Sequence, residues 1–216
     1  MNLTWGHMPL FNRPFLDHPV GMSRLDSAFF ARDVVTVARD LVGSVLEVTG
    51  DDGITCSGRI VEVEAYGGED DPASHAGRGQ TPRSAIMYGP PAVAYVYLIY
   101  GMHHCLNFVT GPEGSASAVL IRAVEPLEGR DRMAERRGLD VAKCRDRDIA
   151  AGPGRLCRAM GIDLGWNGSN LNGSCGIEVL AGDPPAVVEA TPRIGIRQAA
   201  DRPHRFVDPA SPCLSI

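Results

Sequence analysis

Lysine is almost absent from this sequence, and negative charge exceeds positive charge. Lys143 is the only lysine among 216 residues, which disfavours covalent catalysis through a lysine Schiff base. The 21 Lys and Arg residues against 26 Asp and Glu give a formal net charge of −5. Taken alone, this sum argues against a polyanionic partner, because phosphate groups are bound mainly by Lys and Arg.

The charged residues are unevenly distributed along the chain, so the net charge does not describe each segment. Acidic residues dominate from Asp51 to Asp71, where Arg59 is the only basic residue. Two later stretches, 130–158 and 193–205, are rich in arginine. Either they form solvated faces interleaved with acidic residues, or they mark a surface for an anionic partner. The charges alone leave both interpretations open.

Long apolar runs and clustered cysteines are also missing. No run of 18 apolar residues occurs, and the N-terminus has no basic segment followed by an apolar one. We therefore expect neither a membrane span nor a secretion signal. The six cysteines include no C-x-x-C pair, which predicts free thiols in a reducing cytoplasm.

The length and composition suit one compact unit. A chain with 44% hydrophobic residues and this length can bury one sizeable core. No internal repeat or interdomain linker is visible. We expect a single domain over residues 29–216, preceded by an arm over residues 1–28 that lacks a clear hydrophobic period.

Hydrophobic periodicity predicts one early helix followed mainly by strands. Val34, Val37, Ala38 and Leu41 form an apolar stripe that predicts a helix over 33–41. Because strands are seldom followed by helices, the order predicts an α+β fold with a largely antiparallel sheet and peripheral short helices. The expected strands are 44–49, 54–65, 92–100, 104–110, 117–123, 177–181 and 193–197, and the expected later helices are 130–137 and 156–160.

Two glutamates share one face of the strand expected over 54–65. A period of two places Glu62 and Glu64 on the same side as Ile60. Glu64 lies at the end of the strand, just before the loop that begins at Tyr66, and a carboxylate held by a rigid strand can serve as a general base. The alternative is an exposed strand glutamate without a chemical role.

All five tyrosines of the chain lie within residues 66–100. Aromatic rings stack on unpaired bases and can enter the gap that an everted nucleotide leaves. An ordinary aromatic strand explains Tyr95 and Tyr97 equally well. Tyr100 precedes Gly101 at an expected turn, where core packing explains it less well.

Metal coordination is not expected from the histidines. His103 and His104 are adjacent, so on a strand they point to opposite faces. No H-E-x-x-H pattern includes them, His75 or Cys105.

A glycine-rich turn precedes the helix expected over 156–160. The segment 152–155 reads Gly-Pro-Gly-Arg, and backbone N–H groups at a helix start can receive a phosphate. Gly154 and Arg155 are therefore candidates for phosphate binding. The segment lacks the G-x-x-x-x-G-K-[ST] pattern, so a nucleoside triphosphate site is not expected.

Three longer segments together resemble the alkyladenine (3-methyladenine) DNA glycosylase family of bacteria and animals. They are GRIVEVEAYGGEDDPASHAGRGQTPRSAIMYGP, AYVYLIYGMHHCLNFV and AVLIRAVEPLEG, and a thinner similarity continues through AGPGRLCRAMGI and RIGIRQAADRPHRF. The resemblance covers most of the chain from about Phe29 onward. It implies a mostly antiparallel α+β fold, similar to the C-terminal domain of formyltransferases, and no metal or cofactor.

The resemblance also implies roles for individual residues. Glu64, in VEVEAY, would activate water, and Arg122, in LIRA, would lie beside it and help to hold the water and a phosphate. Tyr100, in IYGM, would be the wedge that enters the DNA through the minor groove. The pocket for the extruded base would be formed by Tyr66, His75, Tyr97 and Asn107, the last disfavouring the 2-amino group of guanine.

The function implied by the resemblance is monofunctional DNA glycosylase activity in base excision repair. Such an enzyme flips an alkylated or deaminated purine out of duplex DNA and hydrolyses its N-glycosidic bond, leaving an abasic site. Alkylation makes the purine cationic, and electron-rich tyrosines attract cations. We expect double-stranded DNA with damaged purines as the partner, no membrane or metal, a monomeric state, and a cytoplasmic, nucleoid-associated location in a bacterium.

Two functions of other classes remain open at this point. A non-catalytic damaged-DNA-binding protein would keep the pocket, although the presence of both Glu64 and Arg122 argues against it. A hydrolase of free nucleosides would need no basic surface. Salt-dependent binding to duplex DNA separates the glycosylase from this second alternative.

Overall fold

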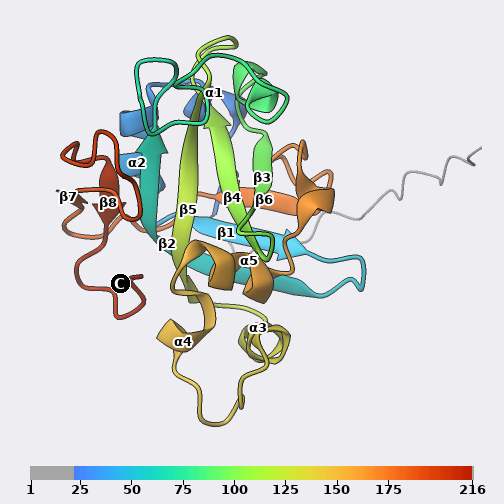
Figure 1. Cartoon of the computed structure of the whole chain (residues 1–216). Coiled ribbons are helices and arrows are strands. Elements are labelled where there is room, and N and C mark those ends of the chain that lie inside the picture. Colours follow the sequence, from blue (N-terminus) through green and yellow to red (C-terminus); the bar gives the residue numbers. More distant parts are fainter. Residues whose placement is uncertain (1–21, 216) are drawn as a thin grey trace, which may run out of the picture.

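An antiparallel sheet forms the frame of the molecule, which the computed structural model describes over residues 22–215 (Figure 1). The main strand order is β3-β4-β5-β2-β1-β6, and β8 pairs with both β2 and β7. The strands are β1 (Val45–Thr49), β2 (Thr55–Tyr66), β3 (Ala94–Ile99), β4 (His103–Thr110), β5 (Ser117–Pro126), β6 (Ile177–Leu180), β7 (Glu189–Thr191) and β8 (Arg205–Val207).

The sheet curls because β2 changes its neighbour along its length. The first part of β2 pairs with β1, as Val45 does with Arg59, and its last part pairs with β8, as Glu64 does with Arg205. β5 follows the other side of β2. In Figure 1, β1 and β6 run across the middle of the view, while β5 and β4 stand upright. The predicted α+β fold with a largely antiparallel sheet is confirmed, and the sheet is curved.

Short helices cover the sheet. The early helix is present as predicted: the Asp33 side chain accepts the backbone N–H groups of Val35 and Thr36 at its start, and its apolar stripe is buried. This helix packs against β2 and β5, whereas α5 packs against β4 and β5. The helices are α1 (Ser27–Phe30), α2 (Val34–Leu41), α3 (Arg130–Arg137), α4 (Asp146–Ala150) and α5 (Pro153–Met160), with 3-10 turns η1 (Ala85–Tyr88) and η2 (Leu164–Trp166).

The pairing of β2 with β5 is irregular at the glutamates. Ile60 pairs with Val124, Glu62 with Ala123, and Val63 with Ile121. β2 therefore carries one extra residue at Val61, and β5 carries one at Arg122. Two compensating irregularities of this kind re-aim side chains without changing the register on either side.

This irregularity corrects one prediction. Ile60 belongs to the main hydrophobic core together with Val63, whereas both Glu62 and Glu64 contact Arg122. The strict alternation expected for this strand therefore fails at Ile60. The two carboxylates still meet at one point, as expected.

The strand predicted over 193–197 is wrong, because this segment forms bends between β7 and β8. The backbone N–H of Ile194 donates to the Glu64 carboxylate, with N to Oε1 at 2.7 Å. Arg193 forms a buried ion pair with Asp71. The N–H of Ile194, which a strand would have donated to a neighbouring strand, is therefore taken by the Glu64 side chain.

The predicted arm over 1–28 lies mostly outside the described residues, which begin at residue 22. Within the described part of the arm, the backbone N–H of Leu25 donates to the carbonyl oxygen of Val179 at 2.8 Å. All six cysteines are free thiols. Among the helices of residues 22–215, none combines the length and the apolar character needed to cross a bilayer.

Candidate active site

Two adjoining cavities open on one side of the sheet. They share a wall that contains Ile99, Tyr100, Cys105, Arg122 and Pro153. The smaller cavity has a volume of about 330 Å³, and its lining includes four tyrosines and one histidine. The larger one has a volume of about 670 Å³ and is rich in arginine.

The smaller cavity brings together the four residues predicted to form a base pocket. Tyr66, His75, Tyr97 and Asn107 all line it. The His75 and Tyr97 rings meet edge to face, with centroids 4.7 Å apart, and the buried Asn107 donates from Nδ2 to the carbonyl oxygen of Tyr95 at 3.0 Å. The volume lies at the lower end of those typical of small-molecule sites.

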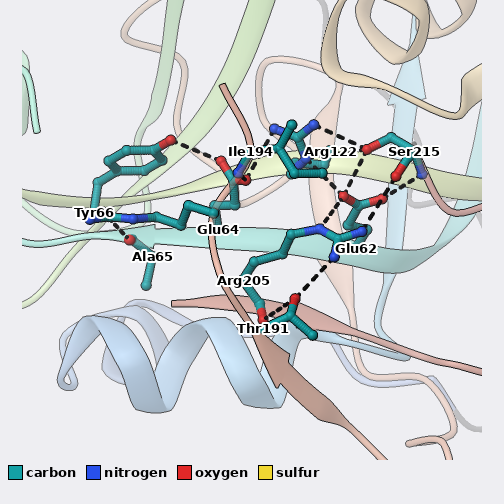
Figure 2. A network of polar contacts seen from close by, with 10 residues as sticks. Glu62, Glu64, Ala65, Tyr66, Arg122, Thr191, Ile194, Arg205 and Ser215 are labelled. Carbon is teal, nitrogen blue, oxygen red and sulfur yellow. Dashed lines mark hydrogen bonds and ion pairs between the residues drawn. The ribbon is translucent and has the colours of Figure 1, made fainter. Parts of the chain in front are cut away.

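Glu64 is 0% exposed. It contacts Tyr66, Arg122 and Ile194, which all line the smaller cavity. Figure 2 shows its carboxylate pointing toward Tyr66 and Arg122. The Tyr66 hydroxyl donates to Oε2 at 2.8 Å, the Ile194 N–H donates to Oε1 at 2.7 Å, and Arg122 Nη1 is 3.2 Å from Oε1. The alternative of an exposed glutamate is therefore wrong for Glu64.

The ring of Tyr66 packs against a buried ion pair formed by Arg193 and Asp71. The Arg193 guanidinium lies 4.7 Å from the centre of the Tyr66 ring. It makes two contacts to Asp71, Nη1 to Oδ2 at 2.5 Å and Nη2 to Oδ1 at 2.9 Å. Burial and the nearby charge of Glu64 raise the pKa of the Tyr66 phenol. The phenol therefore stays protonated and donates to Glu64.

Glu62 is also 0% exposed. Its Oε1 accepts from Arg122 Nε at 2.8 Å, from Arg205 Nε at 2.7 Å and from the Ser215 hydroxyl at 2.7 Å. Its Oε2 accepts from the Ser215 N–H at 2.6 Å. Two carboxylates and two guanidinium groups thus neutralise one another inside the protein (Figure 2).

Arg122 occupies the point between the two carboxylates. Its Nε faces Glu62 and its Nη1 faces Glu64. Burial opposes the charge of this guanidinium, but Glu64 and Glu62 outweigh that effect and raise its pKa. Arg122 is therefore a permanent cation in the wall that the two cavities share.

His75 is neutral at pH 7. Burial, together with the charge of Arg83, lowers the pKa of His75 to about 4. Its Nδ1 lies 2.8 Å from the Tyr95 hydroxyl, and either atom can be the donor. The ring can therefore exist in either tautomer, and its other nitrogen is a donor in one and an acceptor in the other.

Tyr100 projects from the turn between β3 and β4, as predicted from Gly101. Its side chain is 83% exposed, and its backbone is left-handed, with φ 53°. The same side chain borders both cavities. An exposed aromatic ring at the rim of a cavity is available to a ligand rather than to the core.

The larger cavity contains both candidates for phosphate binding. Gly154 and Arg155, at the start of α5, line it together with Arg137 and Arg147. Burial and the charges of Arg155 and Arg158 lower the pKa of Arg137. A Cβ on Gly154 would lie 3.0 Å from the Cβ of His103, so glycine at this position permits the close approach of α5 to β4.

Histidines and cysteines do not gather with carboxylates in this region. Across residues 22–215, no group of three or more His, Cys, Asp or Glu side chains is placed to hold a metal ion. His103 is exposed at the edge of the larger cavity, and Cys105 is buried between the two cavities.

Comparison with known proteins assigns this chain to a family. The family model for methylpurine-DNA glycosylases matches residues 28–212. The chain belongs to this family. It is a DNA glycosylase, a hydrolase of N-glycosyl bonds, and its substrate is DNA. The resemblance found in the sequence is confirmed.

Relatives of the glycosylase occur in archaea and bacteria. One from Methanoculleus marisnigri is 47% identical over 186 residues, which is 84% of this chain and 93% of that protein. One from Burkholderia lata is 46% identical over 88% of this chain and 90% of its own. One from Rhodopseudomonas palustris is 50% identical over 82% and 83%, respectively. All three are named provisionally as 3-methyladenine DNA glycosylases.

Several residues of the glycosylase site were not found from the sequence. Ser215 and Arg205 reach Glu62 across 153 and 143 residues of chain, and Arg193 reaches Asp71 across 122. No local spacing connects positions so far apart. For Glu62 a signal existed, since strand alternation placed it beside Glu64.

Proposed function

We propose that this glycosylase receives an alkylated or deaminated purine, flipped out of duplex DNA, in the smaller cavity and hydrolyses its N-glycosidic bond with water activated by Glu64. The product is an abasic site. One observation carries the proposal: the buried carboxylate of Glu64 lies directly behind the aromatic cavity, between Tyr66 and Arg122.

The free capacity of the Glu64 carboxylate supports a role as general base. A carboxylate oxygen can accept two hydrogen bonds. Oε1 accepts from Ile194 and contacts Arg122, whereas Oε2 accepts only from Tyr66 among the described residues. Oε2 therefore retains an acceptor position, which in this proposal receives the water molecule.

The bond changes in this reaction balance without a metal or cofactor. The water oxygen bonds to C1′ of the sugar, and its proton passes to Glu64. The C1′–N bond breaks, and its electron pair leaves with the purine. A purine alkylated at N3 or N7 leaves as a neutral base, whereas hypoxanthine needs a proton as it departs.

The two tautomers of His75 support a substrate range that includes deaminated purines. An alkylated adenine offers an amino donor at position 6, and hypoxanthine offers a carbonyl acceptor there. The neutral His75 ring, paired with the Tyr95 hydroxyl, can present an acceptor to the first and a donor to the second.

The surroundings of the cavity support binding to duplex DNA. Tyr100 projects at the rim, where it would fill the space of the flipped nucleotide. Arg137, Arg147 and Arg155 line the neighbouring larger cavity, where they would contact backbone phosphates. Phosphate contacts of this kind position a protein on DNA of any sequence.

The test is single-turnover base release from duplexes that carry one ethenoadenine, hypoxanthine or 3-methyladenine. Protein and duplex are incubated in EDTA, and abasic sites are then cleaved with alkali. We expect Glu64→Gln to bind the lesion duplex like the parent and to lose about 10²- to 10⁴-fold in release rate, the usual contribution of a general base.

Glu69→Gln is the matched control, because Glu69 lies in the loop after β2 and is exposed. It should release base at the parent rate. Undiminished release by Glu64→Gln would contradict the assignment of the base.

A further inference from the structure

We propose that Ser215, together with Glu62, is a positioning residue for Arg122. It prevents Arg122 from forming a bidentate contact, with two parallel hydrogen bonds, to the Glu64 carboxylate. This inference rests on the proposed function, since it concerns the carboxylate that would activate water. Ser215 is buried and lies where Arg122 and Glu62 meet (Figure 2).

Ser215 contacts both partners through one hydroxyl. Its Oγ donates to Glu62 Oε1 at 2.7 Å and accepts from Arg122 Nη2 at 3.1 Å, with Arg122 Nε at 3.3 Å. The hydroxyl is therefore oriented by Glu62 and offers its lone pairs to Arg122. A side chain that only filled space would not need this polarity.

The contacts divide the guanidinium of Arg122 into two halves. Nε and Nη2 face Glu62 and Ser215, and Nη1 alone reaches Glu64, at Oε1. Arginine and a carboxylate prefer a paired contact through two parallel N–H···O bonds. Such a contact to Glu64 would use Oε2 as well, which is the oxygen left open for water.

Arg205 helps to neutralise the charge of the buried Glu62 carboxylate. It contacts Glu62 Oε1 through Nε at 2.7 Å and holds the Thr191 hydroxyl through Nη1 at 3.0 Å. Because Arg205 supplies a second positive charge to Glu62, Arg122 remains available to Glu64. Removal of one member of a buried charge network would leave another without compensation.

The segment that carries Ser215 is anchored at several earlier points. Asp208 forms an ion pair with Arg59 at 2.8 Å, and the Ser211 hydroxyl donates to Glu125 Oε1 at 2.6 Å. Cys213 is fully buried against Val61. These contacts fix the segment to β2 and β5, the two strands that carry Glu62, Glu64 and Arg122.

The experiment compares Ser215→Ala with Ser211→Ala in the full chain. Both replacements remove a buried hydroxyl that donates to a glutamate, but only Ser215 contacts Arg122. We expect Ser215→Ala to lose about tenfold in single-turnover release, the equivalent of one hydrogen bond to a charged group, with unchanged affinity for the lesion duplex. Ser211→Ala, which removes one anchor of the same segment without touching Arg122, should lose much less, and Ser215→Thr, which restores a hydroxyl, should recover most of the parent rate.

A crystal structure of Ser215→Ala gives a measurement that does not depend on activity. We expect Arg122 Nη2 to move onto Glu64 Oε2. A guanidinium that keeps its parent position, or a release rate equal to that of Ser211→Ala at the same folded fraction, would overturn the proposal. If the folded parent released no base, the proposed function would fail, and the position of Arg122 in the variant would still decide the role of Ser215.

Discussion

Tyr100 and His75 illustrate how single residues in this site are prepared for opposite tasks. Tyr100 is exposed and makes no contribution to the described hydrophobic clusters. His75 is held neutral by its surroundings. The first is exposed to a ligand, and the second would place no positive charge beside the cationic purine of the proposed function.

Replacing Tyr100 by alanine should weaken binding to a lesion duplex without lowering stability. Loss of a stacking ring costs about 1–3 kcal/mol, so we expect the Kd to rise about tenfold or more. Fluorescence anisotropy measures the Kd, and thermal unfolding measures the Tm. Leu164→Ala, at another exposed apolar residue, is the control, and an unchanged Kd for Tyr100→Ala would contradict the wedge role.

His75 should make the stability of the protein fall in mild acid. Its pKa is lowered from an ordinary 6.5 to about 4, so between these values the unfolded chain binds a proton that the folded chain does not. The free energy of unfolding should therefore decrease, relative to a His75→Gln variant, as the pH falls from about 6.5 to about 4. Above pH 6.5 the difference between the two proteins should stay constant; urea unfolding at several pH values measures it.

Residue-scale prediction from the sequence worked where the local pattern defined the position. Strand alternation and the following loop placed Glu64 at the end of β2, as the structure has it, whereas its role as a base came from the family resemblance and stays a prediction. The neutrality of His75 could not be found, since it depends on burial and on the charge of Arg83 in the folded chain. Ser215 was missed for a similar reason, because its partners lie in β2 and β5.

At the scale of elements, the junction of β2, β5 and the segment after β7 builds the site. The irregular pairing inserts Arg122 into β5 opposite the two glutamates. The bends at 193–197 then bring Arg193 behind Tyr66 and the Ile194 N–H onto Glu64. Regular strands at either place would have moved these groups away from one another.

The buried pair of Asp71 and Arg193 should be essential to this junction. Asp71→Asn leaves Arg193 buried without a matching charge, which typically costs about 3–5 kcal/mol of stability. The Tm should drop markedly, and base release should decline in the fraction that remains folded. Asp148→Asn, which breaks an exposed pair with Arg145, should change the Tm far less; equal effects would argue against a special role for the buried pair.

The elements themselves were largely predictable. The early helix and six of the seven expected strands appear close to their expected bounds, because apolar periodicity and turn residues mark them locally. The segment 193–197 was mistaken for a strand because its alternation of isoleucine with polar residues resembles one. The conformation of this segment is decided by Glu64 and Asp71, which come from distant parts of the chain.

At the scale of the whole molecule, arginine placement matters more than net charge. The chain carries a formal charge of −5, yet several arginines face the larger cavity while many others are paired with acidic residues. Arg130, Arg132 and Arg145 each contact an aspartate. The interpretation as charges interleaved with acidic residues therefore holds for these three arginines, whereas a surface for an anionic partner stays a prediction for the arginines of the larger cavity.

Binding to lesion duplex should weaken with salt in proportion to the phosphate contacts. Each contact contributes a slope of about −0.9 in a plot of log affinity against log salt concentration. Arg155→Ala should reduce the slope by about that amount, equally for damaged and undamaged duplex. Arg145→Ala, at an exposed arginine outside the cavity, is the control, and an unchanged slope for Arg155→Ala would exclude Arg155 from the DNA interface.

The left-handed backbone of Tyr100 bears on how the protein searches DNA. For a residue with a Cβ this conformation carries a cost of roughly 1 kcal/mol, and here the hydrogen bond from the Met102 N–H to the Ile99 carbonyl oxygen closes the turn. Because folding has already fixed the turn, the backbone of Tyr100 needs no further ordering when the protein binds DNA. In the proposed wedge role, the entry of the ring would then depend mainly on how readily a base step unstacks, which favours weakly stacked damage.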